Sequence, residues 1–384
     1  MKKTFFILLL LLLTLGKTFG QTIYKPPYLN YPMDSSVKTA VLTALDTLFS
    51  QLKNDKLDTL LLGKGRGDFN VLKSFKGIED NKKDSIANFY KKQLINIYPI
   101  SNNQYWLSLA FIGAKPNEPP VLRAIINLIA TNNANQITFS TPLSILTKNW
   151  QSKQVGNVTY YFRDKINLAR AIRFNEKNTV IATKLGLTPE KFKFYMCNNY
   201  QEILQLLGFE YDSENNGVTR EGYGVDNNTI FSIVNNEDFS HDLFHYYSDK
   251  FRQMKGNRTV EEGIAYSWGN AYYPNAKGEM IEQSDLVKSL KGYLKENPTT
   301  SLYQLFTKDT KIFNSIAKEI SVKSTIASLL CDEVERQKGV EGIQTMIKCG
   351  RGDDNFFKVL ESLIAVNAAN FDETVLKLIA NYQK

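Results

Sequence analysis

The spacing of apolar residues changes near residue 166, and this change does most to restrict what the chain can fold into. Before it, Val41, Leu45, Leu48 and Leu52 recur at helical spacing, and apolar segments of strand character follow. The expected strands are 105–112, 121–130, 136–140 and 155–163. After it, we expect a helix at 166–185, a strand at 192–197, a helix at 200–207 and a strand at 229–234. A helix begins near Asp238, and helices dominate beyond residue 259. This order predicts an α+β protein.

The N-terminus has the features of a secretory signal peptide. Lys2 and Lys3 precede an apolar run at 5–15, and Thr18 and Gly20 occupy positions −3 and −1 before Gln21. Eleven apolar residues span about 16 Å as a helix, which is short of a hydrocarbon core of roughly 30 Å. No other window is long and apolar enough to span a bilayer. We therefore expect export to the periplasm or the outside, without stable membrane insertion.

These patterns predict three segments: a signal peptide at 1–20, an N-terminal α+β accessory domain at 21–165 and a second domain at 166–384. The chain has 47 Lys and Arg against 39 Asp and Glu, a net charge of +8. Basic and acidic residues are interspersed, with no run of five basic residues, so we expect no nucleic-acid partner. The sequence does not predict an oligomeric state.

The only two histidines of the chain are His241 and His245, four residues apart. On a helix, positions i and i+4 project from one face with Cβ atoms about 6 Å apart, so two imidazoles can bind one metal ion. A catalytic zinc ion needs a third protein ligand, and Glu261 and Glu262 begin the next helical segment. The alternative is a pair of ordinary helical histidines.

His-x-x-x-His on a helix, followed by Glu262-Gly-x-Ala on a second helix, resembles the gluzincin metallopeptidases. The resemblance covers roughly 166–384, a peptidase MA-like domain. It implies a Zn²⁺ ion bound by His241, His245 and Glu262, with Asp242 in the position of the general base. It also implies a peptide or protein substrate, hydrolysed by a water that zinc and this carboxylate activate.

The sequence departs from the family in two ways. Asp242 replaces the usual Glu, which draws the carboxylate back by one methylene. Only sixteen residues separate His245 from Glu262, fewer than is usual, so Glu261 stays open as the third ligand. The sequence therefore leaves an alternative function, a catalytically inactive pseudo-peptidase that binds a peptide or another ligand.

Further expectations concern the surroundings of the site and the accessory domain. Tyr266, Tyr272 and Tyr273 are candidate donors to a developing oxyanion, and together with Trp268 they can line a groove or pack in the core. Asp238 and Asp249 can hold a ligand imidazole or serve as surface polar residues. In element order, the N-terminal half resembles the nuclear transport factor 2 and SnoaL-like fold.

The three cysteines are too few for a disulfide scaffold. Cys331 and Cys349 can bridge two neighbouring helices, whereas Cys197 is expected to pack as a small apolar side chain.

Overall fold

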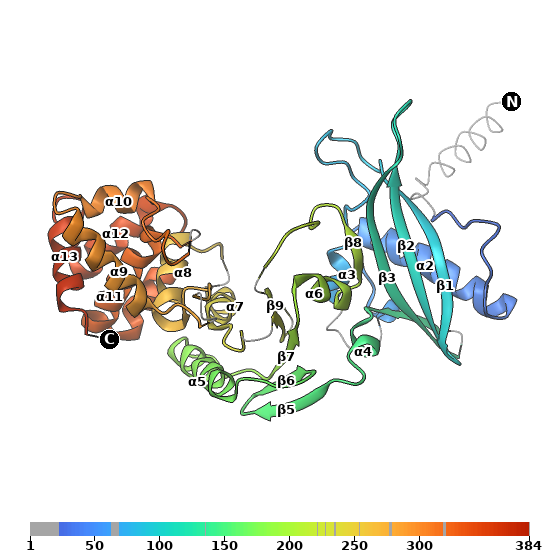
Figure 1. Ribbon diagram of the computed structural model, residues 1–384, viewed down its shortest axis with the longest axis horizontal. Coiled ribbons are helices and arrows are strands. Elements are labelled where there is room, and N and C mark those ends of the chain that lie inside the picture. Colours follow the sequence, from blue (N-terminus) through green and yellow to red (C-terminus); the bar gives the residue numbers. More distant parts are fainter. Residues whose placement is uncertain are drawn as a thin grey trace, which may run out of the picture. The chain divides into compact units, whose positions relative to one another are not determined.

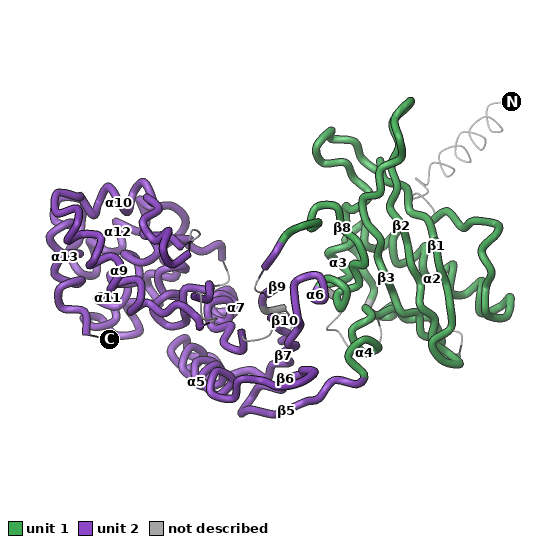
Figure 2. Tube along the Cα trace, viewed as in Figure 1, with its two compact units in different colours: residues 1–148, 204–218 green, residues 149–203, 219–384 purple. Residues whose placement is uncertain are grey.

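The structure is a computed structural model that describes residues 23–383 except 63–68, 135, 221, 227, 234–235, 253, 276–278 and 318–319. The expected signal peptide lies outside these residues. The chain forms two compact units, Met1–Lys148 with Leu204–Val218, and Asn149–Ile203 with Thr219–Lys384 (Figure 2). An antiparallel sheet dominates the N-terminal half and helices the C-terminal part, which confirms the α+β class. Among the described residues, no helix combines the length and the apolar character needed to cross a membrane.

The first unit is an antiparallel sheet with a long helix on one face (Figure 1). Its strands are β1 (Lys91–Ser101), β2 (Gln104–Gly113), β3 (Val121–Asn133), β4 (Gln136–Ser140) and β8 (Phe209–Asp212). They lie in the order β1-β2-β3-β4, and β8 also pairs with β3. Helix α2 (Ser35–Lys53) buries the predicted Val41, Leu45, Leu48 and Leu52. The short helices are α3 (Phe69–Lys73), α4 (Leu143–Leu146) and a 3₁₀ turn at Thr59–Leu61.

The second unit begins with a mixed sheet. Its strands are β5 (Gln151–Val155), β6 (Val158–Phe162), β7 (Phe192–Cys197), β10 (Thr229–Ile233) and β9 (Gly222–Asp226), in that spatial order. Strands β6, β7 and β10 are parallel, while β5 and β9 pair antiparallel at the two edges. Helix α5 (Leu168–Lys184) connects β6 to β7, and α6 (Tyr200–Leu206) follows β7. Strand β9 is thus an edge strand of this sheet.

Helices complete the second unit (Figure 1). They are α7 (Ser240–Arg252), α8 (Arg258–Ile264), a π-helix (Ala265–Gly269), α9 (Gln283–Glu296), α10 (Leu302–Lys308), α11 (Val322–Ile347), α12 (Asp353–Ile364) and α13 (Phe371–Asn381). Gly339, with φ +66°, breaks α11 into the two helical runs that the sequence predicts. One apolar core extends from the sheet into these helices.

The structure corrects the predicted boundary at residue 166. The segment 155–163, expected as one strand of the first domain, contains a hairpin turn at Gly156, whose φ is +55°. Its second arm, β6, pairs with β7, so both arms belong to the second unit. Strands β1, β5, β8 and β9 were not predicted. A register shift between Leu94 and Asn96 breaks the alternation of β1, and β8 and β9 are only four and five residues long.

The expected bridge between Cys331 and Cys349 is wrong, because all three cysteines are free thiols. Cys331 is buried in the apolar core, where burial raises the pKa of its thiol. The Cys349 thiol instead contacts the Gly350 carbonyl at 3.5 Å. Cys197 is buried in β7, as its apolar context predicts.

Candidate metal centre

The two imidazoles of α7 turn their Nε2 atoms toward each other. Nδ1 of His241 lies 2.9 Å from the Asn270 carbonyl oxygen, and Nδ1 of His245 lies 3.3 Å from Oε2 of Glu261. Carbonyl and ionised carboxylate oxygens only accept hydrogen bonds, so each Nδ1 carries the hydrogen. In the neutral form of each ring, Nε2 then carries no hydrogen and presents its lone pair. The Nε2 atoms of the two rings lie 3.2 Å apart. This is the tautomer that a metal ion needs from a histidine ligand.

The Glu262 carboxylate completes the cluster. Its Oε2 lies 3.5 Å from Nε2 of His241, and its Oε1 lies 3.8 Å from Nε2 of His245. Ligand atoms of the three residues lie within 4.8 Å of one another, the only such group of three or more His, Cys, Asp or Glu among the described residues.

The donor set and its spacing fit zinc. Two imidazole nitrogens and one carboxylate, with one position left open, are a known set for catalytic zinc. At bond lengths of about 2.0–2.1 Å, two ligands of a tetrahedral ion lie roughly 3.4 Å apart. The separation of 3.2 Å between the two Nε2 atoms is close to that value, and each Nε2 has one oxygen of the Glu262 carboxylate at 3.5 or 3.8 Å.

Glu261 lies behind the cluster rather than in it. Besides Nδ1 of His245, its carboxylate accepts hydrogen bonds from Ser248 Oγ at 2.7 Å and Arg252 Nη1 at 2.7 Å. Glu261 is buried, and the side chain of Arg252 is largely covered, with 13% of it exposed. Glu261 is therefore placed to orient His245, and of the two glutamates only Glu262 faces both Nε2 atoms.

The two imidazoles differ in their affinity for a proton. Burial, together with the neighbouring His245, lowers the pKa of His241 to about 3, although the Asn270 carbonyl opposes this shift. Burial also acts to lower the pKa of His245, but the hydrogen bond to Glu261 and the charges of Glu262, Glu261 and Asp242 outweigh it. The pKa of His245 is therefore raised above its ordinary value of 6.5. Without a metal, the extra proton of the pair resides on His245.

Zinc affinity is expected to fall as the pH falls through the raised pKa of His245. Zinc and the proton compete for Nε2 of His245, so each zinc ion bound below that pKa releases about one proton. His241, with a pKa of about 3, contributes no pH dependence near neutrality. Calorimetric titration of metal-free protein in buffers of different ionisation enthalpy measures the released protons. An affinity that does not change between pH 5 and pH 8 would contradict this assignment.

Asp242 lies beside the cluster on the same helix. Burial raises the pKa of its carboxyl to about 6, with a further increase from Glu262 and an opposing effect of His245. A methyl group built on Gly224 of β9 would lie 3.7 Å from Oδ2 of Asp242, so this carboxylate is next to the edge strand. A carboxylate with a pKa of about 6 is suited to accept a proton near neutral pH.

The cluster lines a polar cavity of about 660 Å³ in the second unit. Asp242 and all three tyrosines proposed as oxyanion donors, Tyr266, Tyr272 and Tyr273, also line it. Burial raises the pKa of Tyr266, which keeps its phenol protonated and able to donate a hydrogen bond. Trp268 does not line the cavity, because its ring packs edge-on against Phe244 and its Nε1 donates to Glu335.

The position of Glu262 depends on how α8 begins and how closely it packs. Asn257 caps the helix by accepting from the backbone N–H groups of Thr259 and Val260. Its Nδ2 donates to the carbonyls of Gly350 and Gly352, which attaches this end of α8 to the loop before α12. Gly263 lies against α11, where a Cβ would come within 2.9 Å of the Ala327 Cβ.

Gly263→Ala is expected to destabilise the protein by about 1–3 kcal/mol, because the added methyl group overpacks the contact between α8 and α11. The matched control is Gly292→Ala, on the exposed side of α9, where a new Cβ meets nothing within 4 Å. That substitution is expected to stabilise by about 0.5–1 kcal/mol, since Ala is the better helix former. Urea unfolding of both variants measures the difference. Equal effects of the two substitutions would contradict the close packing.

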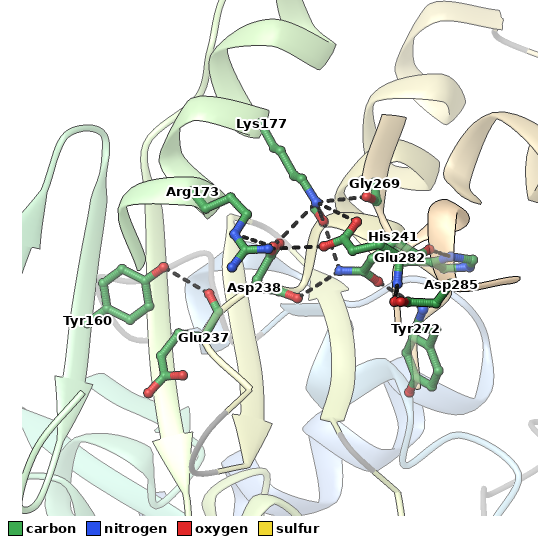
Figure 3. A network of polar contacts seen from close by, with 12 residues as sticks. Tyr160, Arg173, Lys177, Glu237, Asp238, His241, Gly269, Tyr272, Glu282 and Asp285 are labelled. Atoms are coloured by element: carbon green, nitrogen blue, oxygen red, sulfur yellow. Dashed lines mark hydrogen bonds and ion pairs between the residues drawn. The ribbon is translucent and has the colours of Figure 1, made fainter. Parts of the chain in front are cut away.

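The two aspartates expected near the imidazoles do not contact them. Asp238 is buried and pairs with Lys177 and Arg173 (Figure 3). Asp249 is exposed and pairs with Arg252. The imidazoles are held by Glu261 and by the main-chain carbonyl of Asn270. Ser248 and Arg252 were missed, although both follow His241 and His245 on one face of α7 at helical spacing.

Comparison with models of known protein families finds no match, and comparison with curated proteins finds no significant match. The functional conclusion therefore rests on the chemistry of the site.

Proposed function

We propose that the protein is an exported zinc metallopeptidase of the gluzincin type. The observation that carries the proposal is the convergence of two Nε2 atoms, in the tautomer that binds metals, with the Glu262 carboxylate at separations that fit zinc. His241, His245 and Glu262 would hold the ion. A bound zinc ion would supply a Lewis acid that polarises a peptide carbonyl and activates water.

In this proposal Asp242 is the general base. Its half-buried carboxylate takes a proton from water and passes it to the leaving amine, and its pKa of about 6 keeps it ionised above that pH. Tyr266, protonated because its pKa is raised, can donate a hydrogen bond to the developing oxyanion from the cavity wall.

Strand β9 supports a peptide as the substrate. It is an edge strand, paired on one side with β10, and its Gly224 is next to Asp242. An extended peptide can add to a sheet edge through main-chain hydrogen bonds, which would carry its backbone past the Asp242 carboxylate.

The metal content of purified protein lacking residues 1–20 tests the proposal. We expect about one zinc per chain by elemental analysis without added metal, followed by cleavage of peptide substrates that a chelator abolishes. A protein with no zinc, which takes up none on titration at neutral pH, would contradict a metallopeptidase. Zinc binding without cleavage of any peptide tested would instead favour a pseudo-peptidase that binds peptides.

A further inference from the structure

A buried polar network connects α5, the start of α7 and the loop after the π-helix (Figure 3). Asn270, which is fully buried, lies at its centre. Its Nδ2 donates to the Asp238 carbonyl at 3.2 Å and to Ser240 Oγ at 3.1 Å. The main-chain carbonyl of Asn270 accepts a hydrogen bond from Nδ1 of His241 at 2.9 Å. The side chain of Asn270 thus connects its own main chain, whose carbonyl orients His241, to the residues at the start of α7.

Lys177 of α5 contacts the same two segments from the other side. Its Nζ donates to the Gly269 carbonyl at 2.7 Å, next to Asn270, and to Ser240 Oγ at 3.3 Å. It also lies 3.4 Å from Oδ2 of the buried Asp238. The two segments approach so closely that a Cβ on Gly269 would lie 2.8 Å from the Ser240 carbonyl oxygen. Lys177 and Asn270 together fasten the loop to the first turn of α7.

The same asparagine holds a strained residue of the cavity wall. Tyr272 has φ +71°, a conformation that is rare for a bulky aromatic residue. Its backbone N–H donates to Oδ1 of Asn270 at 2.8 Å, and its ring lies 5.6 Å from the His241 ring. Strain of this kind persists only where neighbouring contacts fix it, and it clusters at functional sites. The hydrogen bond to Oδ1 of Asn270 is one contact that fixes it here.

We propose that Asn270 is a positioning residue that fixes the orientation of the metal ligand His241 and the backbone of the cavity residue Tyr272. Lys177 holds together the two segments that Asn270 joins. Asn270 touches neither the metal position nor a substrate through its side chain. It acts by fixing the direction of the His241 ring, as the outer partners of histidine ligands do in zinc sites. This inference rests on the proposed zinc site.

Asn270→Ala is the test, with Asn178→Ala as the matched control. Asn178 is equally buried in the same unit. Its side chain donates to the Glu190 carbonyl and accepts from the Tyr247 hydroxyl, and neither of these groups touches an imidazole. We expect Asn270→Ala to weaken zinc binding by about 10-fold, the low end of the effect of altering an outer partner, because alanine keeps the main-chain carbonyl that His241 contacts and loses only the side-chain bonds that fix it. Asn178→Ala is expected to lower the melting temperature and leave the zinc affinity unchanged. Competition with a chelator of known affinity gives the dissociation constants.

Lys177→Met provides a second test if Asn270→Ala does not fold. Arg173 remains within 3.9 Å of Asp238 in that variant, so the buried carboxylate keeps a partner. Lys177→Met is expected to weaken zinc binding in the same direction, and where both variants fold, the double variant should lose less than the sum of the two.

The outcomes separate this inference from the proposed function. If the wild-type protein binds no zinc, both are wrong. If the wild type binds zinc and neither Asn270→Ala nor Lys177→Met weakens it, only the positioning role is wrong. If Asn178→Ala weakens zinc binding as much as Asn270→Ala, the network has a general structural role, and the positioning role is again overturned.

Discussion

Glu262→Gln is expected to weaken zinc binding far more than Glu261→Gln, although the two residues are adjacent and the chemical change is the same. In the proposed site Glu262 supplies a ligand carboxylate, and losing one of three ligands would remove about 3–5 kcal/mol of a total near 10–16 kcal/mol. That loss is roughly 10²- to 10⁴-fold in affinity. Glu261 orients His245 from behind, so its substitution is expected to cost about 10- to 100-fold.

In the metal-free protein, Glu261→Gln is expected to lower the free energy of unfolding more than Glu262→Gln does. Glu261 forms a buried ion pair with Arg252 at 2.7 Å and accepts from Ser248, so Glu261→Gln weakens two buried contacts. Such a loss costs about 1–3 kcal/mol. Glu262 faces the cavity near the Asp242 carboxylate and the His245 imidazole, so removing its charge removes a repulsion from the first and an attraction to the second, and these two effects oppose each other. Chelator competition and urea unfolding of the metal-free variants measure the two effects. If Glu261→Gln abolishes zinc binding while Glu262→Gln keeps it, Glu261 is the third ligand.

The elements and the cluster of side chains that the sequence predicted and the structure contains have a local pattern in common. His241 and His245 are one helical turn apart, and the expected strand at 192–197 coincides with β7. The predicted Glu262 reaches the cluster because Gly263 lets α8 pack closely on α11. Amphipathic and i, i+4 spacing depend only on the chain near each residue, so one sequence is enough to detect them.

The parts that the sequence did not predict depend on contacts between distant segments. The partner of His241 is a main-chain carbonyl, a group that every type of residue carries, so the sequence alone does not point to it. Strand β9, with Gly222 and Gly224, lacks the β-branched and aromatic run of a typical strand and forms because β10 pairs with it. The boundary between units was misplaced for the same reason, since β6 is assigned by its pairing with β7.

Asp242→Asn is expected to lower turnover of a peptide substrate by about 10²- to 10⁴-fold while one zinc per chain stays bound. The amide keeps the size and the polarity of the carboxyl group but cannot accept a proton from water. The proposed zinc ligands His241, His245 and Glu262 are untouched, so metal content serves as the internal control for folding. Kinetics at saturating substrate and elemental analysis of the same sample test both parts.

Asp249→Asn is the matched control for this substitution. Asp249 lies on the same helix, but its side chain is 67% exposed and pairs only with Arg252 among the interactions described, so turnover is expected to stay unchanged. The wild type and this control should also lose activity as the pH falls through about 6. The reason is that the raised pKa of Asp242 leaves the base protonated below that pH.

Asp242→Glu then distinguishes a peptidase from a pseudo-peptidase. The longer side chain moves the carboxylate outward by about 1.5 Å, which is a large change for a base that must lie 2.6–3.2 Å from its proton donor. If the wild type cleaves peptides, Asp242→Asn must remove that activity, and an active Asp242→Asn variant would exclude Asp242 as the base. If the wild type binds zinc but cleaves nothing, a gain of cleavage in Asp242→Glu would identify the short side chain as the reason that the site is silent. The wild-type site would then be a zinc centre used for binding, whose carboxylate at Asp242 is one methylene too short for catalysis.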